Sequence, residues 1–277
     1  MTARLLHRLS LWPAAALLLA VVLSAGCGTT IPTQDPVRLT LAASSSALPL
    51  AGDLARAYHA AYPHISVDVL PLANEAAAAQ AVLAGRADAA LAAGMAHVPD
   101  QLTASHIATD ALAIIVHPDR PLDNLTGQQI QDVFSGRLRT WDALDAGDGD
   151  IQVLTREPDS GPRLALVGAF LGTRPLTPTA LVLPDDRQIV SSLAGSPEAI
   201  AAIPAGWLNG QVEAVEIDGR GPEWVARQWP DYPAELPIYL LTPSAPTPET
   251  IALRAWLLSP QGQRIVGQRY APAANQP

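Results

Sequence analysis

The sequence predicts an α/β fold, because short apolar runs alternate along the chain with segments of helical periodicity. The chain has 277 residues and 49% of them are hydrophobic, which is enough for a substantial core and for two lobes of ordinary size. Aromatic residues make up only 5% of the chain and alanine is abundant, so the helices are expected to pack closely.

The earlier elements alternate between the two types. In chain order they are a strand at 37–42, a helix at 50–62, a strand at 65–70, a helix at 76–84 and strands at 88–92 and 111–117. The first helix carries Leu50, Leu54 and Ala57 on one face, and Pro63 ends it. Gly85 closes the second helix, because glycine commonly follows the last helical turn.

The later elements follow the same logic. They are a helix at 126–134, a strand at 151–155, a helix at about 162–171, a strand at 238–241 and helices at 247–258 and 261–270. Thr126 and Gln129 form a capping-box pattern at the start of the first of these helices, and Ser135-Gly136 marks its end.

All 17 basic residues are arginine, and this composition excludes several classes of function. A P-loop needs a lysine on its phosphates, and a Schiff-base enzyme needs a lysine amine. The formal net charge is −9 and no basic stripe compensates for it, so nucleic acid is not an expected partner. If the protein binds an anion, it must do so with local groups.

Residues 1–27 have the pattern of a targeting segment. A basic start precedes an apolar run at 14–23 that is too short to span a membrane. Small residues then lead to Cys27, the only cysteine, and the pattern resembles the lipobox of bacterial lipoproteins, although Ser24 stands where that family prefers leucine. We expect a lipidated Cys27, a tether at 28–36 and membrane attachment through the lipid alone. The alternative is a plain secretory signal with an incidental cysteine.

Six segments resemble, in order and spacing, motifs of the phosphate-binding (PstS-like) proteins of bacterial ABC importers. They are Ala-Ser-Ser-Ser-Ala-Leu-Pro-Leu at 43–50, Asp-Ala-Leu-Ala-Ile-Ile-Val-His-Pro at 110–118, Leu-Thr…Val-Phe-Ser-Gly…Trp within 125–141, Arg-Glu-Pro-Asp-Ser-Gly-Pro-Arg at 156–163, Pro-Glu-Ala-Ile-Ala at 197–201 and Leu-Ser-Pro-Gln-Gly-Gln at 258–263. They span nearly all of the chain after the leader, and their common order is more specific than any one of them.

The resemblance implies a two-lobed periplasmic binding protein fold of type II, with two strands crossing between the lobes and the ligand in the cleft. Lobe one would comprise 37–115 and 236–277, and lobe two 116–235, with crossings near Ile115 and Leu236. It also implies an exported, lipid-anchored monomer that captures a small oxyanion, with phosphate as the first expectation, for an ABC permease.

Two strand-to-helix junctions suit an anion independently of the resemblance. Ser44, Ser45 and Ser46 lie before one helix, and Ser160 and Gly161 lie before another. Backbone N–H groups at a helix start are unpaired and favour negative charge. The alternative is that these serines merely cap their helices.

Arg156 ends a strand and can present a fork of donors to an oxyanion, unless it only pairs with a neighbouring acid on the surface. By the resemblance, the ligand contacts are Ser46, Ala47 through its backbone N–H, Arg156, Ser160 and Gly161. Asp159 is expected to accept a proton from a protonated phosphate and so to discriminate against sulfate.

Three positions depart from the pattern of these relatives. Asn74-Glu75 stand at a Gly-Ser step, Pro162 replaces a threonine, and Ala92-Ala93 replace a charged residue. A carboxylate at Glu75 would repel a dianion unless it points away or is protonated. Weaker phosphate binding, a different small oxyanion and loss of binding therefore all remain open.

Two other classes of function remain open as well. A sensor or partner-binding lipoprotein on the same fold would explain the missing donors. A hydrolase is a remote alternative suggested by Ser160 beside Asp159, but the chain has no Gly-x-Ser-x-Gly elbow and its histidines lack metal-site spacing. We therefore expect no enzymatic activity, no cofactor and no metal.

Overall fold

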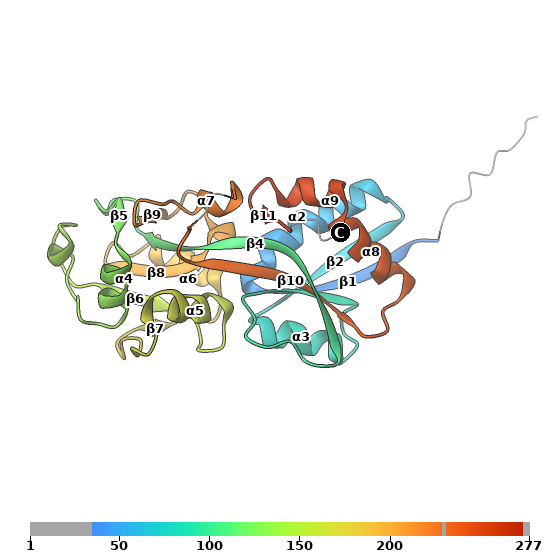
Figure 1. Cartoon of the computed structure of the whole chain (residues 1–277), viewed down its shortest axis with the longest axis horizontal. Helices are drawn as coiled ribbons and strands as arrows, with labels where there is room; N and C mark the ends of the chain where they lie inside the picture. The colour runs from blue at the N-terminus through green and yellow to red at the C-terminus, as the bar shows by residue number, and fades with distance from the viewer. Residues whose placement is uncertain (1–34, 229–230, 274–277) are drawn as a thin grey trace, which may run out of the picture. The chain divides into compact units, whose positions relative to one another are not determined.

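A computed structural model describes residues 35–228 and 231–273 of the chain (Figure 1). The predicted leader, the lipidated Cys27 and residues 28–34 of the tether lie outside the described residues. The chain from Pro36 onward forms one compact unit. Within the described residues, no helix combines the length and the apolar character needed to cross a membrane.

One group of strands, here called sheet A, contains the N-terminal strands and the C-terminal return of the chain. Its members are β1 (Val37–Ser44), β2 (Ile65–Leu72), β3 (Ala89–Ala93), β10 (Glu235–Pro243), β11 (Ala271–Pro272) and the first part of β4 (Leu102–Val116). β1 pairs in parallel with β2 and β3, whereas β10 runs antiparallel to β3 and β4. The strand order is β2-β1-β3-β10-β4.

Helices cover both faces of sheet A. They are α2 (Leu48–Ala61), α8 (Pro248–Leu258) and α9 (Pro260–Val266) on one face and α3 (Glu75–Leu83) on the other (Figure 1). Leu50, Leu54 and Tyr58 of α2 share a buried cluster with Trp256 of α8. The α3 face is built mainly from alanine, whose small side chains bring the helix close to the strands.

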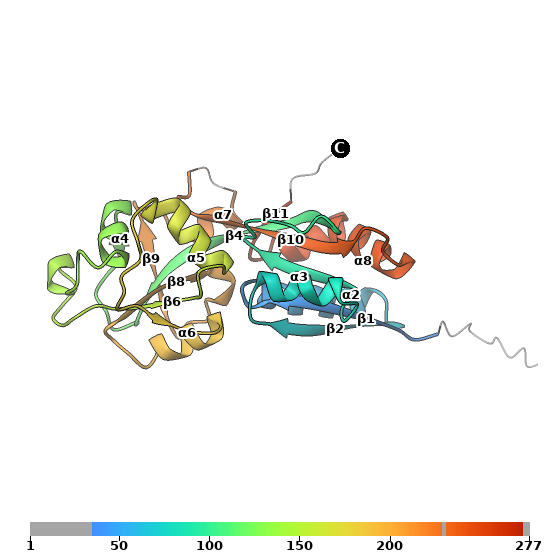
Figure 2. The same ribbon diagram turned by 90° about the horizontal axis from the view of Figure 1, so that it is seen from below.

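A second group of strands, here called sheet B, continues from the far end of β4. Its members are β8 (Ala199–Pro204), β6 (Gln152–Thr155), β7 (Leu181–Val182), β9 (Glu213–Ile217) and the last part of β4, and β5 (Asn124–Leu125) pairs with β9. The strand order continues β4-β8-β6-β7, and Figure 2 shows these strands among their helices.

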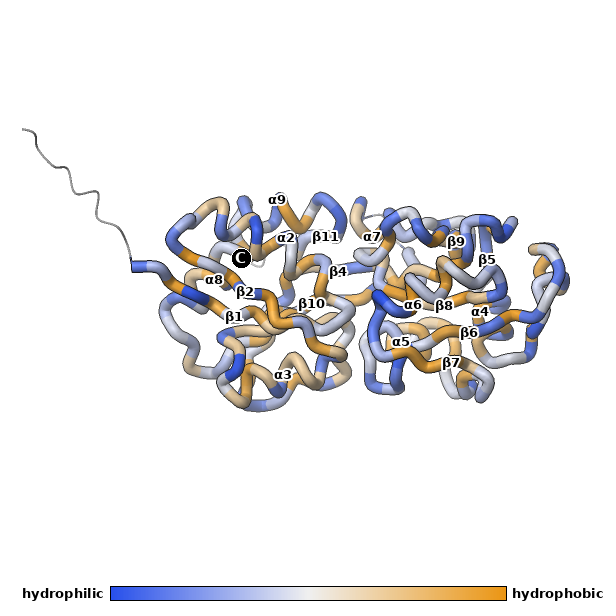
Figure 3. The backbone as a smooth tube through the Cα atoms, turned by 180° about the vertical axis from the view of Figure 1, so that it is seen from behind, coloured by the Kyte–Doolittle hydropathy of each residue, from blue (hydrophilic) through white to orange (hydrophobic). Residues whose placement is uncertain are grey.

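Sheet B is also covered on both faces. Its helices are α4 (Gly127–Phe134), α5 (Gly161–Leu166), a π-helical turn η3 (Val167–Leu171), α6 (Asp186–Leu193) and α7 (Glu223–Ala226), with short 3₁₀ turns η2 (Asp142–Leu144) and η4 (Ala205–Trp207). Phe134 and Trp141 fill one buried cluster, whereas Ile189 and Leu193 of α6 fill another. Figure 3, coloured by hydropathy, shows hydrophobic residues along these strands and hydrophilic residues at many loops.

Two strands join sheet A to sheet B. β4 pairs with β10 as far as Ala111 and with β8 from Leu112 onward, and the chain returns through β10. Tyr232 supports the return, because its hydroxyl donates to the Leu112 carbonyl at 2.9 Å. The predicted α/β class and crossing strands are therefore confirmed. The predicted lobe boundaries, 37–115 with 236–277 and 116–235, stay a prediction.

Each predicted helix and strand has a counterpart, but several elements were missed. Residues 102–110 of β4 were not expected to form a strand, because exposed and half-buried polar residues dilute the apolar pattern there. The helix α6 and strand β8 were also missed. The helix predicted at about 162–171 is present, but it changes from α to π geometry at Val167 and ends at Gly172.

The backbones of the two sheet regions approach closely at two glycines. A Cβ atom on Gly161 would lie 1.9 Å from the Ala93 carbonyl oxygen, and one on Gly94 would lie 3.0 Å from the Gly161 Cα atom. Gly94 also has a φ of +70°, which side-chain-bearing residues rarely adopt. The contact between the regions therefore requires glycine at position 161.

We predict that Gly161→Ala prevents this contact, because the new methyl group cannot share space with the Ala93 carbonyl. Amide hydrogen exchange should show lost protection around residue 161 in the variant. Gly168→Ala is the matched control, since among the described residues no atom outside the adjoining backbone of its own helix lies within 4 Å of a Cβ placed there. Unchanged protection in Gly161→Ala would contradict the close approach.

Candidate functional site

The candidate site lies where strand ends and helix starts from both sheet regions meet. On the sheet A side, β1 ends at Ser44 and leads through the 3₁₀ turn η1 (Ser45–Ala47) into α2. On the sheet B side, Arg156 follows β6, Gly161 begins α5 and Asp186 begins α6. Ligands in open α/β folds bind at such carboxyl ends of strands.

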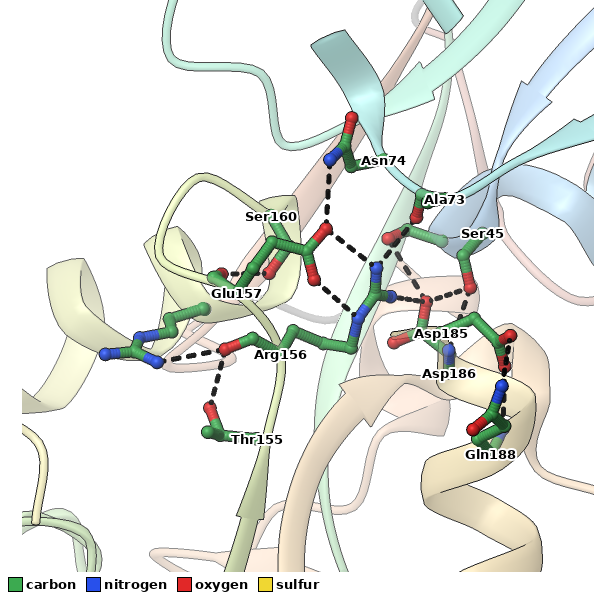
Figure 4. Close-up of polar contacts among 12 residues, drawn as sticks. Ser45, Ala73, Asn74, Thr155, Arg156, Glu157, Ser160, Asp185, Asp186 and Gln188 are labelled. Atoms are coloured by element: carbon green, nitrogen blue, oxygen red, sulfur yellow. Dashed lines mark hydrogen bonds and ion pairs between the residues drawn. The ribbon is translucent and has the colours of Figure 1, made fainter. Parts of the chain in front are cut away.

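Arg156 is the centre of the cluster, and it is only 1% exposed (Figure 4). Its Nη1 atom lies 2.7 Å from Asp186 Oδ2, and its Nη2 atom donates to the Ala73 carbonyl at 2.7 Å. Its Nε and Nη2 atoms also contact the two carboxylate oxygens of Glu157 at 3.1 and 3.2 Å. The guanidinium therefore joins the sheet B region to the loop before α3.

Asp186 accepts donors from both sheet regions. Its Oδ2 atom receives the Ser45 hydroxyl at 2.7 Å and the Ser46 hydroxyl at 3.4 Å, in addition to Arg156. Its backbone N–H donates back to Ser45 Oγ at 2.8 Å. Burial raises the pKa of Asp186, while Arg156 and the serine hydroxyls oppose that rise. One carboxylate oxygen thus sits at the focus of three donors.

Glu75 also joins the two regions, but here the carboxylate belongs to the sheet A region and the donor belongs to the sheet B region. This residue is the first of α3, and its Oε2 atom accepts the Gly161 backbone N–H at 3.1 Å. It is only 3% exposed, and burial raises its pKa to about 7, although the Gly161 N–H and the Ser46 hydroxyl lower it. Glu75 therefore points into the site and takes a donor expected to face a ligand.

Further contacts hold these groups in place. Asn74 caps α3 and donates from Nδ2 to Glu157 Oε1 at 3.0 Å. Arg163, whose role the sequence left open, donates to the Arg156 carbonyl at 2.9 Å. The Trp207 indole N–H donates to the Ser45 carbonyl at 2.9 Å. Each contact either orients a member of the cluster or joins the two regions.

Most of the residues predicted for the site are brought together. Ser45, Ser46, Arg156 and Gly161 are members of the cluster described above, and three more are buried at its borders, namely Ser44, Ala47 and Ser160. The Ser44 hydroxyl has no hydrogen-bond partner within the part of the chain that the structure describes, and the Ser160 hydroxyl donates to the Glu157 carbonyl at 2.9 Å. Asp159 is exposed, and among the described residues no hydrogen bond or ion pair joins its side chain to the cluster.

Asp186 is the member that sequence reasoning missed. The sequence does contain a signal for the helix α6, because Asp185 is a favoured N-cap residue and Ile189 and Leu193 follow at helical spacing. The structure confirms this cap, since Asp185 accepts the Gln188 N–H. Asp186 then falls in the first turn, where a carboxylate is favoured. Nothing in the sequence placed this turn beside Ser45, which is 141 positions away.

The cluster can hold a small anion only if its own carboxylates move away or become protonated. Arg156 contributes one positive charge, while Asp186 and Glu157 each contribute a negative one, and Glu75 adds another when ionised. A dianion would therefore meet a net negative site unless a carboxylate moves away or is protonated. No group of three or more metal-ligating side chains gathers at any one place among the described residues.

A third buried acid, after Asp186 and Glu75, lies on a crossing strand. Asp110 of β4 accepts the Gly206 N–H at 3.0 Å and the Ala111 N–H at 2.8 Å. Burial raises its pKa to about 7, although both N–H groups lower it. Asp110 thus holds the turn that carries Trp207, and it titrates in the same range as Glu75.

We predict that the free energy of unfolding falls as the pH rises toward and through 7. The folded chain holds the Glu75 and Asp110 protons more tightly than the unfolded chain, so this stabilisation is complete below about pH 4 and is lost through pH 7. Glu75→Gln should flatten the dependence by about 3 kcal/mol in urea titrations at pH 5 and pH 8. An equally steep dependence in Glu75→Gln would show that Glu75 titrates normally.

Comparisons with known proteins find relatives of this chain by sequence and by fold. The phosphate-binding protein PstS of Bacillus subtilis (strain 168) is 26% identical to this chain over 119 residues, which are 42% of this chain and 39% of that protein. A protein described as phosphate-binding protein PstS 2, from Streptococcus pneumoniae serotype 4, is 30% identical over 110 residues, or 39% of this chain and 37% of that protein. The matched part of the chain thus spans well under half the length of these relatives.

Solved structures show the fold. A putative phosphate ABC transporter substrate-binding protein with bound phosphate, from Clostridium perfringens, has a TM-score of 0.76 at 24% identity and covers 86% of this chain and 100% of that chain. This likeness confirms the predicted two-lobed periplasmic binding protein fold of type II. The predicted resemblance to PstS-like proteins is confirmed by the curated relatives. The family model described as PBP superfamily domain matches residues 30–261, so the chain belongs to this superfamily.

Proposed function

We propose that this chain is an extracytoplasmic solute-binding lipoprotein that captures a small oxyanion, phosphate first, between two lobes for delivery to an ABC importer. The lobes correspond to 37–115 with 236–277 and to 116–235, and a lipidated Cys27 anchors the chain to the membrane. The protein acts as a monomer without catalysis, and its further partner is the permease.

One observation carries the proposal. Hydroxyls of Ser45 and Ser46 from one region and the Arg156 guanidinium from the other converge on a single anionic oxygen, Asp186 Oδ2. This carboxylate oxygen has the charge and acceptor character of an oxyanion oxygen. Donors from both regions can therefore surround an anion when the regions are in contact, which is how a two-lobed binding protein encloses its ligand.

Three other proposed contacts complete the set. Ser44 comes directly before the turn η1, Ala47 is the last residue of that turn, and Ser160 comes directly before Gly161. The buried Ser44 hydroxyl has no partner in the described residues, so it is a donor still available to a ligand. Asp159 stays a predicted acceptor for the proton of a protonated phosphate, but it is exposed and takes no part in the cluster.

A second candidate function is a sensor or partner-binding lipoprotein on the same fold that no longer takes up a solute. The observation that favours it is the occupation of the site by the chain's own acids. Asp186 takes the serine and arginine donors, and Glu75 takes the Gly161 N–H. The two candidates differ in whether an added anion stabilises the protein.

We predict that phosphate selectively raises the thermal unfolding temperature of the full chain, purified in detergent and freed of phosphate. Because a ligand that binds only the native state stabilises it, a ligand at a hundredfold excess over its Kd should raise the temperature by about 5–10 °C. Sulfate and other oxyanions form the comparison panel. A lack of response to every anion would overturn oxyanion capture and leave the partner-binding function.

Arg156→Ala should abolish the response to phosphate, whereas Arg156→Lys should keep part of it, because lysine retains the charge but not the fork of donors. Arg156→Ala also leaves the buried Asp186 charge unpaired and lowers stability itself, so the ligand-induced shift is the quantity to compare. Arg86→Ala, an exposed residue after α3, is the matched control for loss of one positive charge.

A further inference from the structure

Asp186 meets the donors of the candidate site in a way that the proposed function does not require. Its Oδ2 atom takes Arg156 Nη1 and the Ser45 hydroxyl, both at 2.7 Å, and the Ser46 hydroxyl at 3.4 Å. These are donors that we assign to the captured anion. A carboxylate oxygen with three donors has little capacity left, so an oxyanion and Asp186 cannot both use this position.

The contact also joins the two regions through side chains of the chain itself. Asp186 and Arg156 belong to the sheet B region, whereas Ser45 and Ser46 follow β1 of sheet A. The Asp186 backbone N–H returns a hydrogen bond to Ser45 Oγ at 2.8 Å, so serine and aspartate hold each other across the junction. The anionic group that brings the donors together is therefore part of the chain.

The Asp186 carboxylate is only half satisfied, which makes it a replaceable occupant. Its Oδ1 atom is buried and has no partner in the described residues, and the same is true of the Ser44 hydroxyl at the end of β1. A buried acceptor without a partner costs free energy. A pocket of about 330 Å³ adjoins the cluster, and Ser45, Asp185 and Arg187 are among the residues that line it.

We propose that Asp186 is an internal competitor of the captured anion: its carboxylate holds the two regions together in the absence of ligand and sets how tightly the site binds phosphate. The inference rests on the proposed function for the identity of the competing ligand. Asp186 is thus a specificity-determining residue, because an anion must bind the serine and arginine donors well enough to displace it.

The test compares the full wild-type chain with Asp186→Ala in phosphate-free buffer. Wild type should protect the Gly161 and Ser45 amide segments from hydrogen exchange without ligand, and the variant should lose this protection. Added inorganic phosphate should restore it in Asp186→Ala. Calorimetric titration should show the variant binding phosphate at least about tenfold more tightly than wild type, because a like charge at the anion position is gone.

Two further variants complete the comparison. Asp186→Asn keeps the shape of the side chain and removes its charge, so it should also gain affinity and serves if the alanine variant does not fold. Asp100→Ala removes one acid from an exposed turn and should match wild type in both measurements.

The outcomes separate the inference from the proposed function. If wild type binds phosphate and neither Asp186 variant binds it more tightly, the inference is overturned and phosphate capture stands. If neither wild type nor the variants bind phosphate, both are overturned. If the Asp186 variants bind phosphate and wild type does not, Asp186 excludes the anion completely. The inference then holds, and the wild-type chain is assigned to the partner-binding function.

Discussion

The buried guanidinium of Arg156 is the constraint on which the rest of the site depends. A cation that is 1% exposed must find an acceptor for nearly all of its N–H groups, since burial without partners is costly. Glu157 supplies two acceptors from the neighbouring residue, but the others come from Ala73 and Asp186. Satisfying one side chain therefore brings the loop before α3, the start of α6 and the end of β6 to one point.

The two carboxylates at this point also have an ordinary structural basis. Glu75 and Asp186 are each the first residue of a helix, where the helix dipole favours negative charge. What distinguishes them is their reach, because each accepts a donor from the opposite sheet region. The carboxylates of Glu75 and Asp186 thus both suit their own helix starts and contact the other region. The site expected to bind an anion is therefore rich in acidic residues, as the whole chain is.

The sequence was sufficient for the features that local patterns encode. The capping box of Thr126 and Gln129 is present with both of its hydrogen bonds. The order of motifs shared with the PstS-like relatives, rather than any local pattern, indicated that Ser46, Arg156 and Gly161 belong to one site. It was insufficient where a contact depends on distant packing. Ser45 and Asp186 are 141 positions apart, and no spacing rule relates them. Glu75 shows the same limit. The sequence marks it as different from the PstS-like relatives, but the direction of its side chain depends on where the fold places Gly161.

The 15-residue strand β4 belongs to both sheets, and β10 returns beside it. Any separation of the two regions must therefore twist a continuous two-stranded ribbon rather than pivot on a slack linker. The ladder of β10 on β4 shifts register between Ile238 and Tyr239, and because β10 also pairs there with β3, this irregularity lies within sheet A. Any movement of one region against the other would thus have to deform this ribbon and break the contacts of Arg156 together, although the two lie in different parts of the sequence.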